Sequence, residues 1–280
     1  MPASASAALY GEVPQLQPPP TTALTLIKGV NTEQLTLDEI KAMTPVEGWG
    51  GRLTSVGEVQ GPYQYKGISL ENLCSLVGGI DETNSVKVTA KDGYSMTLSY
   101  DQARGGGFTM FDPTTKGELG TSSVGELMVI LAYEEGGEPL SEQHGGPLRL
   151  CIVDSQNQVT EGHWWVKWIT KVEVQSATEE WTLHLEGAIS EDMDNGSFES
   201  GAAPGCHGVS YTDDKGEWTG IPLWLLVGRV DDDISHGEGA FNDDLVTDPG
   251  YTVRVIASDG YSRDFDSAGV KRNDNIIVAN

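Results

Sequence analysis

Basic residues are scarce in this sequence of 280 residues. Seventeen lysines and arginines stand against 42 aspartates and glutamates, and the formal net charge at pH 7 is −25. Binding to nucleic acid or to an anionic membrane requires a basic surface, so the composition argues against both partners. Any site for an anionic ligand must therefore rely on a few well-placed cations. The acidity also favours a salty or extracellular setting, and we expect an extracytoplasmic or cell-surface location.

Cysteines are also few, and long apolar runs are absent. The three cysteines, Cys74, Cys151 and Cys206, provide neither a disulfide framework nor the ligand spacing of a zinc site. Cys74 and Cys151 lie in the apolar stretches "LENLCSLVG" and "LRLCIVD", which predicts that both are buried. The longest apolar runs, residues 127–133 and 221–227, are far shorter than a membrane span.

The first 21 residues lack the basic start and the long apolar stretch of an intact secretory signal. They are rich in Pro, Ser and Ala, which cannot build a core, so we expect a disordered lead over residues 1–21. The rest of the sequence contains no Ser-His-Asp order, no phosphate-binding loop and no dinucleotide fingerprint.

One phrase occurs twice in the chain, as "AKDGYSMTL" at residues 90–98 and as "ASDGYSRDF" at residues 257–265. Asp-Gly between two alternating runs is a strong signal for a β-hairpin, because both turn positions favour a positive φ. Each phrase therefore predicts a hairpin, which by itself indicates no function.

The sequences around the two hairpins also correspond. "YKGISLENLCSLVGGID" precedes the first and "WTGIPLWLLVGRVD" the second, while "TALTLIKG" and "WTLHLEGA" open the two segments. "VILAY" follows the first hairpin and "IIVAN" the second. The shared order predicts a tandem duplication. We expect a first domain over residues 22–175, a linker over 176–180 and a second, incomplete domain over 181–280.

The first copy continues through two further apolar segments, residues 134–153 and 162–174, which have no counterpart in the second. A domain without these strands would expose sheet edges and apolar surface, so we expect the sequence to be truncated.

Strand-like segments dominate, which predicts a strand-rich α+β fold. Helices are expected at residues 36–43, where Thr36 and Glu39 form a capping box, and at residues 69–77. Residues 101–124 and 190–205 are glycine-rich and predict loops.

The combination of "GISLENL", "VTAKDGYSMTLS", "HGGPLRL" and "VKWITKVEV", in this order, resembles the oxidoreductase molybdopterin-binding domain, the catalytic fold of the sulfite oxidase family. The resemblance implies that fold, complete in the first copy and partial in the second. It also implies molybdopterin with molybdenum as cofactor, and a small-molecule substrate or an electron-transfer partner.

In that family a cysteine thiolate binds the molybdenum, because a soft, negative ligand suits this metal. The matching place in the first copy, "GRLTSVGEV", has Ser55 instead, whose hydroxyl is a hard and rarely ionised ligand. In the second copy the resemblance points to Cys206 as thiolate ligand, with His207 beside it. The family's arginines after this cysteine are replaced by "GVS". A loop cysteine with an incidental histidine is the alternative.

The resemblance also implies that His144, Arg149 and Lys167 contact the pterin, since cations and polar groups bind its phosphate and ring edges. On the residues alone, Arg149 and Lys167 fit outward positions on strands, and His144 fits a turn. Three tryptophans, Trp164, Trp165 and Trp168, are more typical of packing than of a ligand cage.

Acidic stretches at residues 192–200 and 231–244 supply carboxylates of the kind that bind calcium. Neither fits the helix-loop-helix calcium pattern, so solvated loops are favoured.

Two functions remain open from the sequence. One is a molybdopterin-dependent oxidoreductase with Cys206 on the metal. The other is a cofactor-free tandem module that binds a partner or serves as a scaffold, because a fold does not fix a function.

Overall fold

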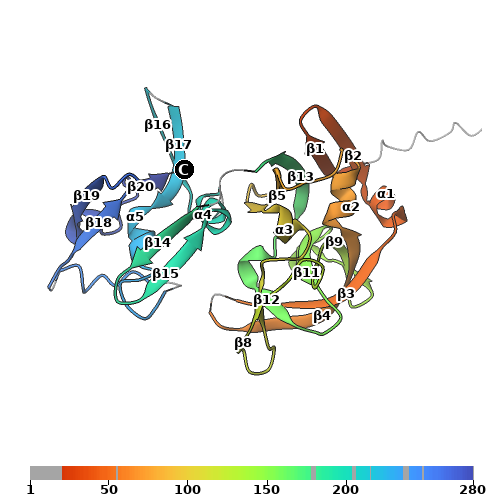
Figure 1. Cartoon of the computed structure of the whole chain (residues 1–280), viewed down its shortest axis with the longest axis horizontal. Helices are drawn as coiled ribbons and strands as arrows, with labels where there is room; N and C mark the ends of the chain where they lie inside the picture. Colours follow the sequence, from red (N-terminus) through yellow and green to blue (C-terminus); the bar gives the residue numbers. More distant parts are fainter. Residues whose placement is uncertain are drawn as a thin grey trace, which may run out of the picture.

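The computed structural model describes residues 21–279 except 55, 178–180, 204–205, 215, 236–239 and 248. The expected lead over residues 1–21 therefore lies almost wholly outside the described residues, as do Ser55 and three of the five residues of the expected linker. Figure 1 shows two lobes side by side. We call residues 22–176 the first lobe and residues 181–279 the second lobe.

The first lobe contains a five-stranded sheet. Its strands are β1 (Thr22–Lys28), β2 (Asn31–Thr36), β5 (Asn84–Ala90), β6 (Ser95–Leu98) and β13 (Ile169–Ser176). They lie in the order β2-β1-β13-β5-β6. β1 pairs in parallel with β13, and β13 pairs antiparallel with β5. The central strand is therefore the last one in the sequence of this lobe.

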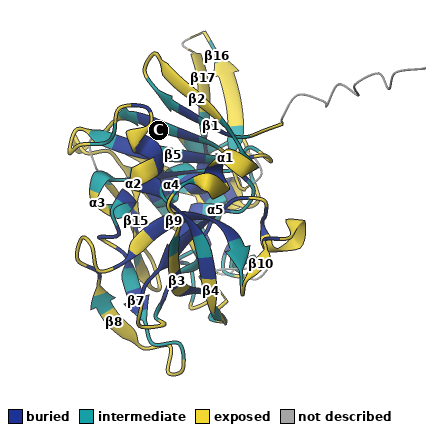
Figure 2. Cartoon of the chain, turned by 90° about the vertical axis from the view of Figure 1, so that its right-hand side faces the viewer, coloured by how far each residue is buried: buried dark blue, intermediate teal, exposed yellow. Residues whose placement is uncertain are grey.

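The second sheet of the first lobe has eight strands. They are β3 (Val46–Leu53), β4 (Val59–Ser69), β7 (Thr109–Phe111), β8 (Glu118–Thr121), β9 (Met128–Glu135), β10 (Glu138–Pro139), β11 (Arg149–Val153) and β12 (Val159–Glu161). Seven follow the order β10-β9-β4-β3-β12-β7-β8, and β11 pairs with β9. Residues of both sheets, such as Leu26 and Leu131, join one buried apolar cluster. In Figure 2, β9 is mostly buried whereas β8 is largely exposed.

Short helices connect these strands. They are α1 (Leu37–Ala42), α2 (Leu70–Ser75), α3 (Tyr100–Ala103) and two 3-10 turns, η1 (Glu142–His144) and η2 (Gly162–Trp164). Thr36 and Glu39 form the predicted capping box of α1, and Ser69 caps α2. Both predicted helices are thus confirmed, although each is shorter than expected. Cys74 and Cys151 are buried as predicted.

The second lobe repeats a pattern of hairpins and short helices. Its elements are β14 (Thr182–Glu186), β15 (Ser190–Asp194), α4 (Asn195–Ala202), β16 (Val209–Asp213), β17 (Gly216–Pro222), α5 (Leu223–Val227), β18 (Thr252–Ile256), β19 (Ser262–Asp266), α6 (Ser267–Val270) and β20 (Ile277–Ala279). One small buried apolar cluster here consists of Met193, Phe198, Ala202, Ile221 and Leu226.

Two loop predictions were wrong. Residues 101–124 hold the hairpin of β7 and β8, because Met110 and Phe108 have a core to enter. Residues 190–205 hold β15 and α4, since Asp194 caps the helix and Phe198 anchors it in the core of the second lobe. The loop predictions rested on the glycine content of these segments. The structure is decided instead by burial of the apolar side chains that the segments contain.

The two lobes share local features, down to individual hydrogen bonds in their Asp-Gly turns. Gly93 and Gly260 both have positive φ, and in each turn the amide of the following tyrosine donates to the Asp carboxylate. The residues around Gly67 pair with β9 as those around Gly220 pair with β20. These features support the predicted repeat, which stays a prediction.

Helix α4 joins the lobes. Thr97 of β6 donates to the Glu199 carboxylate at 2.8 Å, and the Tyr94 hydroxyl bonds to Ser200. Gly196 allows this close approach, because a Cβ there would lie 2.9 Å from the Thr97 carbonyl oxygen. In the part of the chain that the structure describes, no helix is long and apolar enough to cross a membrane.

Candidate functional site

Arg149 opens β11 and is almost completely buried, with 4% of its surface exposed. β11 is buried along its whole length because it pairs with β9 in the centre of the lobe. The alternative in which Arg149 points outward into solvent is therefore wrong. Burial of a cation costs free energy unless other groups neutralise it or form hydrogen bonds with it. The groups around this guanidinium therefore decide how much of that cost is offset.

The Arg149 guanidinium is only partly bonded within the protein. Its Nη1 donates to the His144 carbonyl oxygen at 3.2 Å, whereas its buried Nε and Nη2 have no hydrogen-bond partner among the described residues. Its central carbon lies 5.5 Å from the ring centroid of Trp165. An aromatic face stabilises the guanidinium from one side only. The group therefore keeps donors for a ligand that the protein does not supply.

His144 and Lys167 approach the same place from two turns. His144 ends η1, and its Nδ1 lies 2.9 Å from the Glu135 carboxylate. Lys167 follows η2, and its stem crosses Gly145 so closely that a Cβ there would lie 2.6 Å from the Lys167 Cγ. With Arg149, the structure thus brings together three of the residues predicted from the sequence. Trp165 lies with them, and Trp164 is buried in the core.

A third permanent cation, Arg52 near the end of β3, was not predicted. It lines the same cavity and donates to the Gln60 side chain. Burial lowers the pKa of Arg52, although a guanidinium stays charged at neutral pH. Its positive charge in so acidic a chain is a local signal, but the sequence does not show which residues it lies beside.

These residues surround a cavity of about 310 Å³. Its lining residues are Arg52, Gln60, Tyr63, Tyr65, Glu135, Gln143, His144, Arg149, Trp165 and Lys167. We call it the Arg149 cavity. Three permanent cations face one carboxylate, which already contacts His144. Tyr65 keeps its proton, because burial raises its pKa and its hydrogen bond to Glu135 adds to this. The chemistry of the cavity is that of an anion site.

Cys206 and His207 lie elsewhere, in a cavity of about 600 Å³ between the lobes. Cys206 is exposed as a residue, yet burial of its thiol raises its pKa, which the backbone bond with His207 only partly offsets. The thiol is therefore not activated by its surroundings. The structure does not place this pair with His144, Arg149 and Lys167 in one cavity.

A third hollow, of about 310 Å³, adjoins both cavities. It shares Arg52 and Lys167 with the Arg149 cavity, and it shares Tyr94 and His163 with the cavity of Cys206. The third hollow is therefore a neighbour of both cavities, which remain separate from each other. Ser55, which the sequence resemblance aligns with the metal ligand, lies outside the described residues. No group of three or more His, Cys, Asp or Glu suited to a metal occurs within the described ranges.

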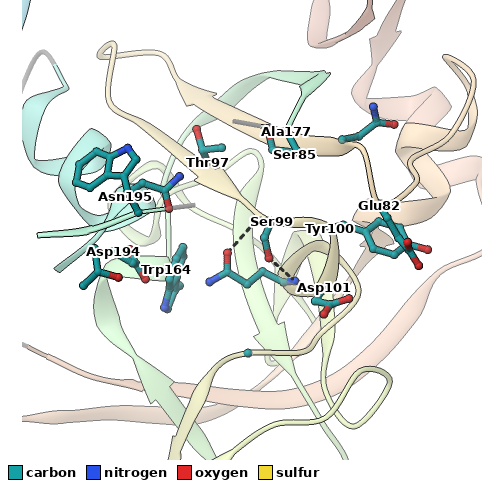
Figure 3. A pocket seen from close by; sticks show the side chains of 16 residues that line it. Glu82, Ser85, Thr97, Ser99, Tyr100, Asp101, Trp164, Ala177, Asp194 and Asn195 are labelled. Atoms are coloured by element: carbon teal, nitrogen blue, oxygen red, sulfur yellow. Dashed lines mark hydrogen bonds between the residues drawn. The ribbon is translucent and has the colours of Figure 1, made fainter. Parts of the chain in front are cut away.

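A further cavity, similar in size to that of Cys206, has the opposite charge. It measures about 660 Å³, and Glu82, Asp101 and Asp194 line it together with Trp164 and Trp181. Figure 3 shows these side chains and the hydrogen bonds that join Ser99 to Gln102. None of its described lining residues is basic. An anionic ligand is therefore disfavoured here, and size alone does not identify the site.

Three comparisons with known proteins bear on this geometry. A family model described as the oxidoreductase molybdopterin binding domain matches residues 10–183. Among solved structures, the sulfane dehydrogenase SoxCD from Paracoccus pantotrophus matches with 17% identity and a TM-score of 0.39, over 55% of this chain and 38% of that chain. The chain thus spans well under half the length of that structure. Comparison with curated proteins finds no match.

Proposed function

Because the chain belongs to the oxidoreductase molybdopterin-binding domain family, we propose that it binds molybdopterin with molybdenum, with the phosphate held in the first lobe, and that the protein is an oxidoreductase acting on a small-molecule substrate. The strand-rich α+β fold is the one that the family implies. Transfer of electrons to a partner protein belongs to the same proposal.

The observation that carries the proposal is the buried, incompletely bonded guanidinium of Arg149. Fixed, desolvated cations bind phosphate strongly, because their charge is poorly screened and their donors need no rearrangement. The chain as a whole has a net charge of −25, yet three cations surround this one small cavity. This local excess of positive charge favours an anionic ligand. The phosphate of a pterin cofactor has the required charge.

The residues present fit the anionic end of the group. Arg149, Arg52 and Lys167 would hold the phosphate by charge-assisted hydrogen bonds, and Trp165 would keep the Arg149 guanidinium in place. When bound, the cofactor supplies a redox-active metal that exchanges electrons or oxygen with a substrate. The protein's own cations would neutralise the phosphate.

Cys206, in the second lobe, is the thiolate that we propose for the metal. The support is limited to its position: it is the exposed thiol of the chain, and its cavity adjoins the hollow next to the cations. Metal binding would have to lower the pKa of this thiol, since the surrounding protein raises it.

The first experiment measures molybdenum and pterin per chain after expression in a host that makes the cofactor. We expect near one of each in the wild-type protein and loss of both in Arg149→Met. This variant should fold, because an apolar chain of similar length replaces a buried cation with two unbonded donors, and its melting temperature should not fall. Arg263→Met, which removes an exposed cation of the second lobe, is the matched control and should retain both.

Cys206→Ser tests the metal ligand separately. Loss of molybdenum with retention of the pterin supports Cys206 as ligand, whereas retention of both shows that the metal is held elsewhere. A folded wild-type protein without either component would overturn the enzyme proposal.

A cofactor-free tandem module for binding or scaffolding is the second candidate. It is favoured by one observation: none of the described residues that line the Arg149 cavity is a cysteine. On this reading the cations bind another anion, and the wild-type protein contains neither pterin nor molybdenum.

A further inference from the structure

The cavity of about 660 Å³ lined by Glu82, Asp101 and Asp194, which we call the acidic cavity, has no role in the function proposed above. Among the described residues, it shares no lining residue with the Arg149 cavity, the cavity of Cys206 or the third hollow. Strands β5 and β6 and helix α3 of the first lobe line it together with the start of α4 of the second. A ligand here would contact both lobes and none of the groups proposed to hold the cofactor.

The negative charge of the acidic cavity is not neutralised by the protein. The side chains of Glu82 and Asp101 form no ion pair and no hydrogen bond among the described residues. The ammonium group of Lys28 donates to Asn84 of the lining, but it also donates to the Gly79 carbonyl oxygen and does not itself line the cavity. Carboxylates are ordinarily ionised at pH 7, so the cavity attracts cations.

A buried hydroxyl group of the same lining has no partner. Ser85 is 5% exposed, and its Oγ makes no hydrogen bond among the described residues. Side chains alternate along β5, and Val86 and Val88 enter the core. The Ser85 side chain therefore lies on the opposite face of the strand, toward the cavity that it lines. A buried hydroxyl without a partner costs free energy, so this oxygen is suited to a donor that a ligand supplies.

Two tryptophans give the acidic cavity an aromatic wall. Trp164 is buried and packs edge-to-face with Phe108, with the ring centroids 5.6 Å apart. Trp181 packs in the same way with Phe198, at 5.2 Å. These contacts hold both indoles in place. An indole attracts a cation to its face, and its apolar surface covers methylene groups.

The carboxylates lie on separate sides of the acidic cavity. Figure 3 shows Glu82 and Asp101 on one side and Asp194 on the other. A single metal ion cannot contact both sides, and no group of three or more His, Cys, Asp or Glu suited to a metal occurs in the described part of the chain. An aliphatic chain that carries separated ammonium groups matches this arrangement.

We propose that the acidic cavity binds a linear aliphatic polyamine. One ammonium group contacts Glu82 and Asp101, and a second contacts Asp194. The Ser85 hydroxyl accepts from an amine N–H, and the methylene groups pack on Trp164. Hydrogen bonds between ammonium and carboxylate are charge-assisted, and no cation of the described lining competes for these carboxylates. The proposal is independent of any cofactor.

The test is isothermal titration calorimetry of the full chain with spermidine, in about 0.15 M sodium chloride so that exposed charges are screened as under physiological conditions. We expect saturable binding at one site per chain. Butylamine, which has a single ammonium group, should bind at least about tenfold more weakly, because it leaves the carboxylates on one side without a partner.

Glu82→Gln and Asp194→Asn should each weaken spermidine binding by about two- to fivefold, the usual contribution of one exposed ion pair. Asn also caps helices, so Asp194→Asn should keep the hydrogen bond from Ser197 that begins α4. Ser85→Ala should weaken binding without lowering the melting temperature, because its hydroxyl has no partner in the free protein. Glu33→Gln is the matched control: it removes an exposed carboxylate of β2 outside the cavity and should not change the affinity.

Three outcomes would overturn the proposal: no saturable binding, equal affinity for spermidine and butylamine, or equal loss of affinity in Glu33→Gln and Glu82→Gln. The last result would show that the net charge of the chain attracts spermidine, and not the acidic cavity.

Discussion

At the scale of single residues, the three cysteines differ in their exposure to solvent. Burial raises the pKa of Cys74 to about 12 and that of Cys151 well above its ordinary value. Cys206 is exposed, and its pKa is raised to a smaller extent, again by burial. The thiolate is the reactive form of a cysteine. The three cysteines are therefore expected to differ in their rates of alkylation as well as in their exposure to the reagent.

We predict that iodoacetamide alkylates only Cys206 in the native protein. Because the pKa of this thiol is raised, less thiolate is present at a given pH, and the midpoint of the rate against pH should lie above about 8.5, the value for a free cysteine. Mass spectrometry of the alkylated protein measures this, with Cys206→Ser as the control. A midpoint at or below that of free cysteine would contradict the burial described for this thiol.

The candidate site was predictable to the extent that local sequence determines it. "HGGPLRL" and "VKW" place His144, Arg149 and Lys167 at the ends of paired segments, and the fold brings them to one cavity. Arg52 and the separate position of Cys206 depend on how distant strands and the two lobes pack. Spacing along the chain does not determine those distances, so sequence reasoning could not find them.

At the scale of secondary-structure elements, two glycines permit the same strand contact in the two lobes. A Cβ at Gly67 would lie 2.2 Å from the Leu131 carbonyl oxygen, and one at Gly220 would lie 2.0 Å from that of Val278. Backbone oxygens cannot move aside as a flexible side chain can. These positions are therefore more restrictive than the glycines of exposed turns.

Gly67→Ala and Gly220→Ala should each lower the free energy of unfolding by about 1–3 kcal/mol, the usual effect of overpacking. Gly269→Ala is the matched control, because it lies in α6 with no atom within 4 Å of the added Cβ. The control should be neutral or stabilising by about 0.5–1 kcal/mol, since Ala favours a helix. Denaturant unfolding of the three variants checks this, and equal effects at all three sites would refute it.

Element prediction succeeded where the signal was local. The capping box of α1 and the Asp-Gly turn are decided by neighbouring residues, and both were found. It failed for residues 101–124 and 190–205, where glycine-rich sequence forms strands and a helix because Met110 and Phe198 reach a core. That core is assembled from segments far away in the chain.

At the scale of the whole molecule, repulsion among acidic groups opposes folding. The net charge of −25 is spread over both lobes, and such self-repulsion destabilises a compact state. Salt shortens the distance over which these charges interact, from about 10 Å at 0.1 M to about 3 Å at 1 M.

The melting temperature at pH 7 should therefore rise when sodium chloride is raised from 0.1 M to 1 M. Each kcal/mol gained corresponds to roughly 2–4 °C for a chain of this size. Near pH 4.3 about half of the carboxylates are protonated, so the same increase in salt should raise the melting temperature less. Differential scanning calorimetry at both pH values checks this. An equal rise at both would indicate a general effect of salt on burial rather than relief of repulsion.

The contact between the lobes joins unlike surfaces: helix α4 of one meets strand β6 and Tyr94 of the other. The surface that one lobe presents in this contact is therefore not the surface that the other lobe presents. In the second lobe Tyr261 follows the Asp-Gly turn as Tyr94 does in the first, and it is 69% exposed. The first lobe therefore leaves Tyr261 exposed, and the two lobes do not meet through the same surface.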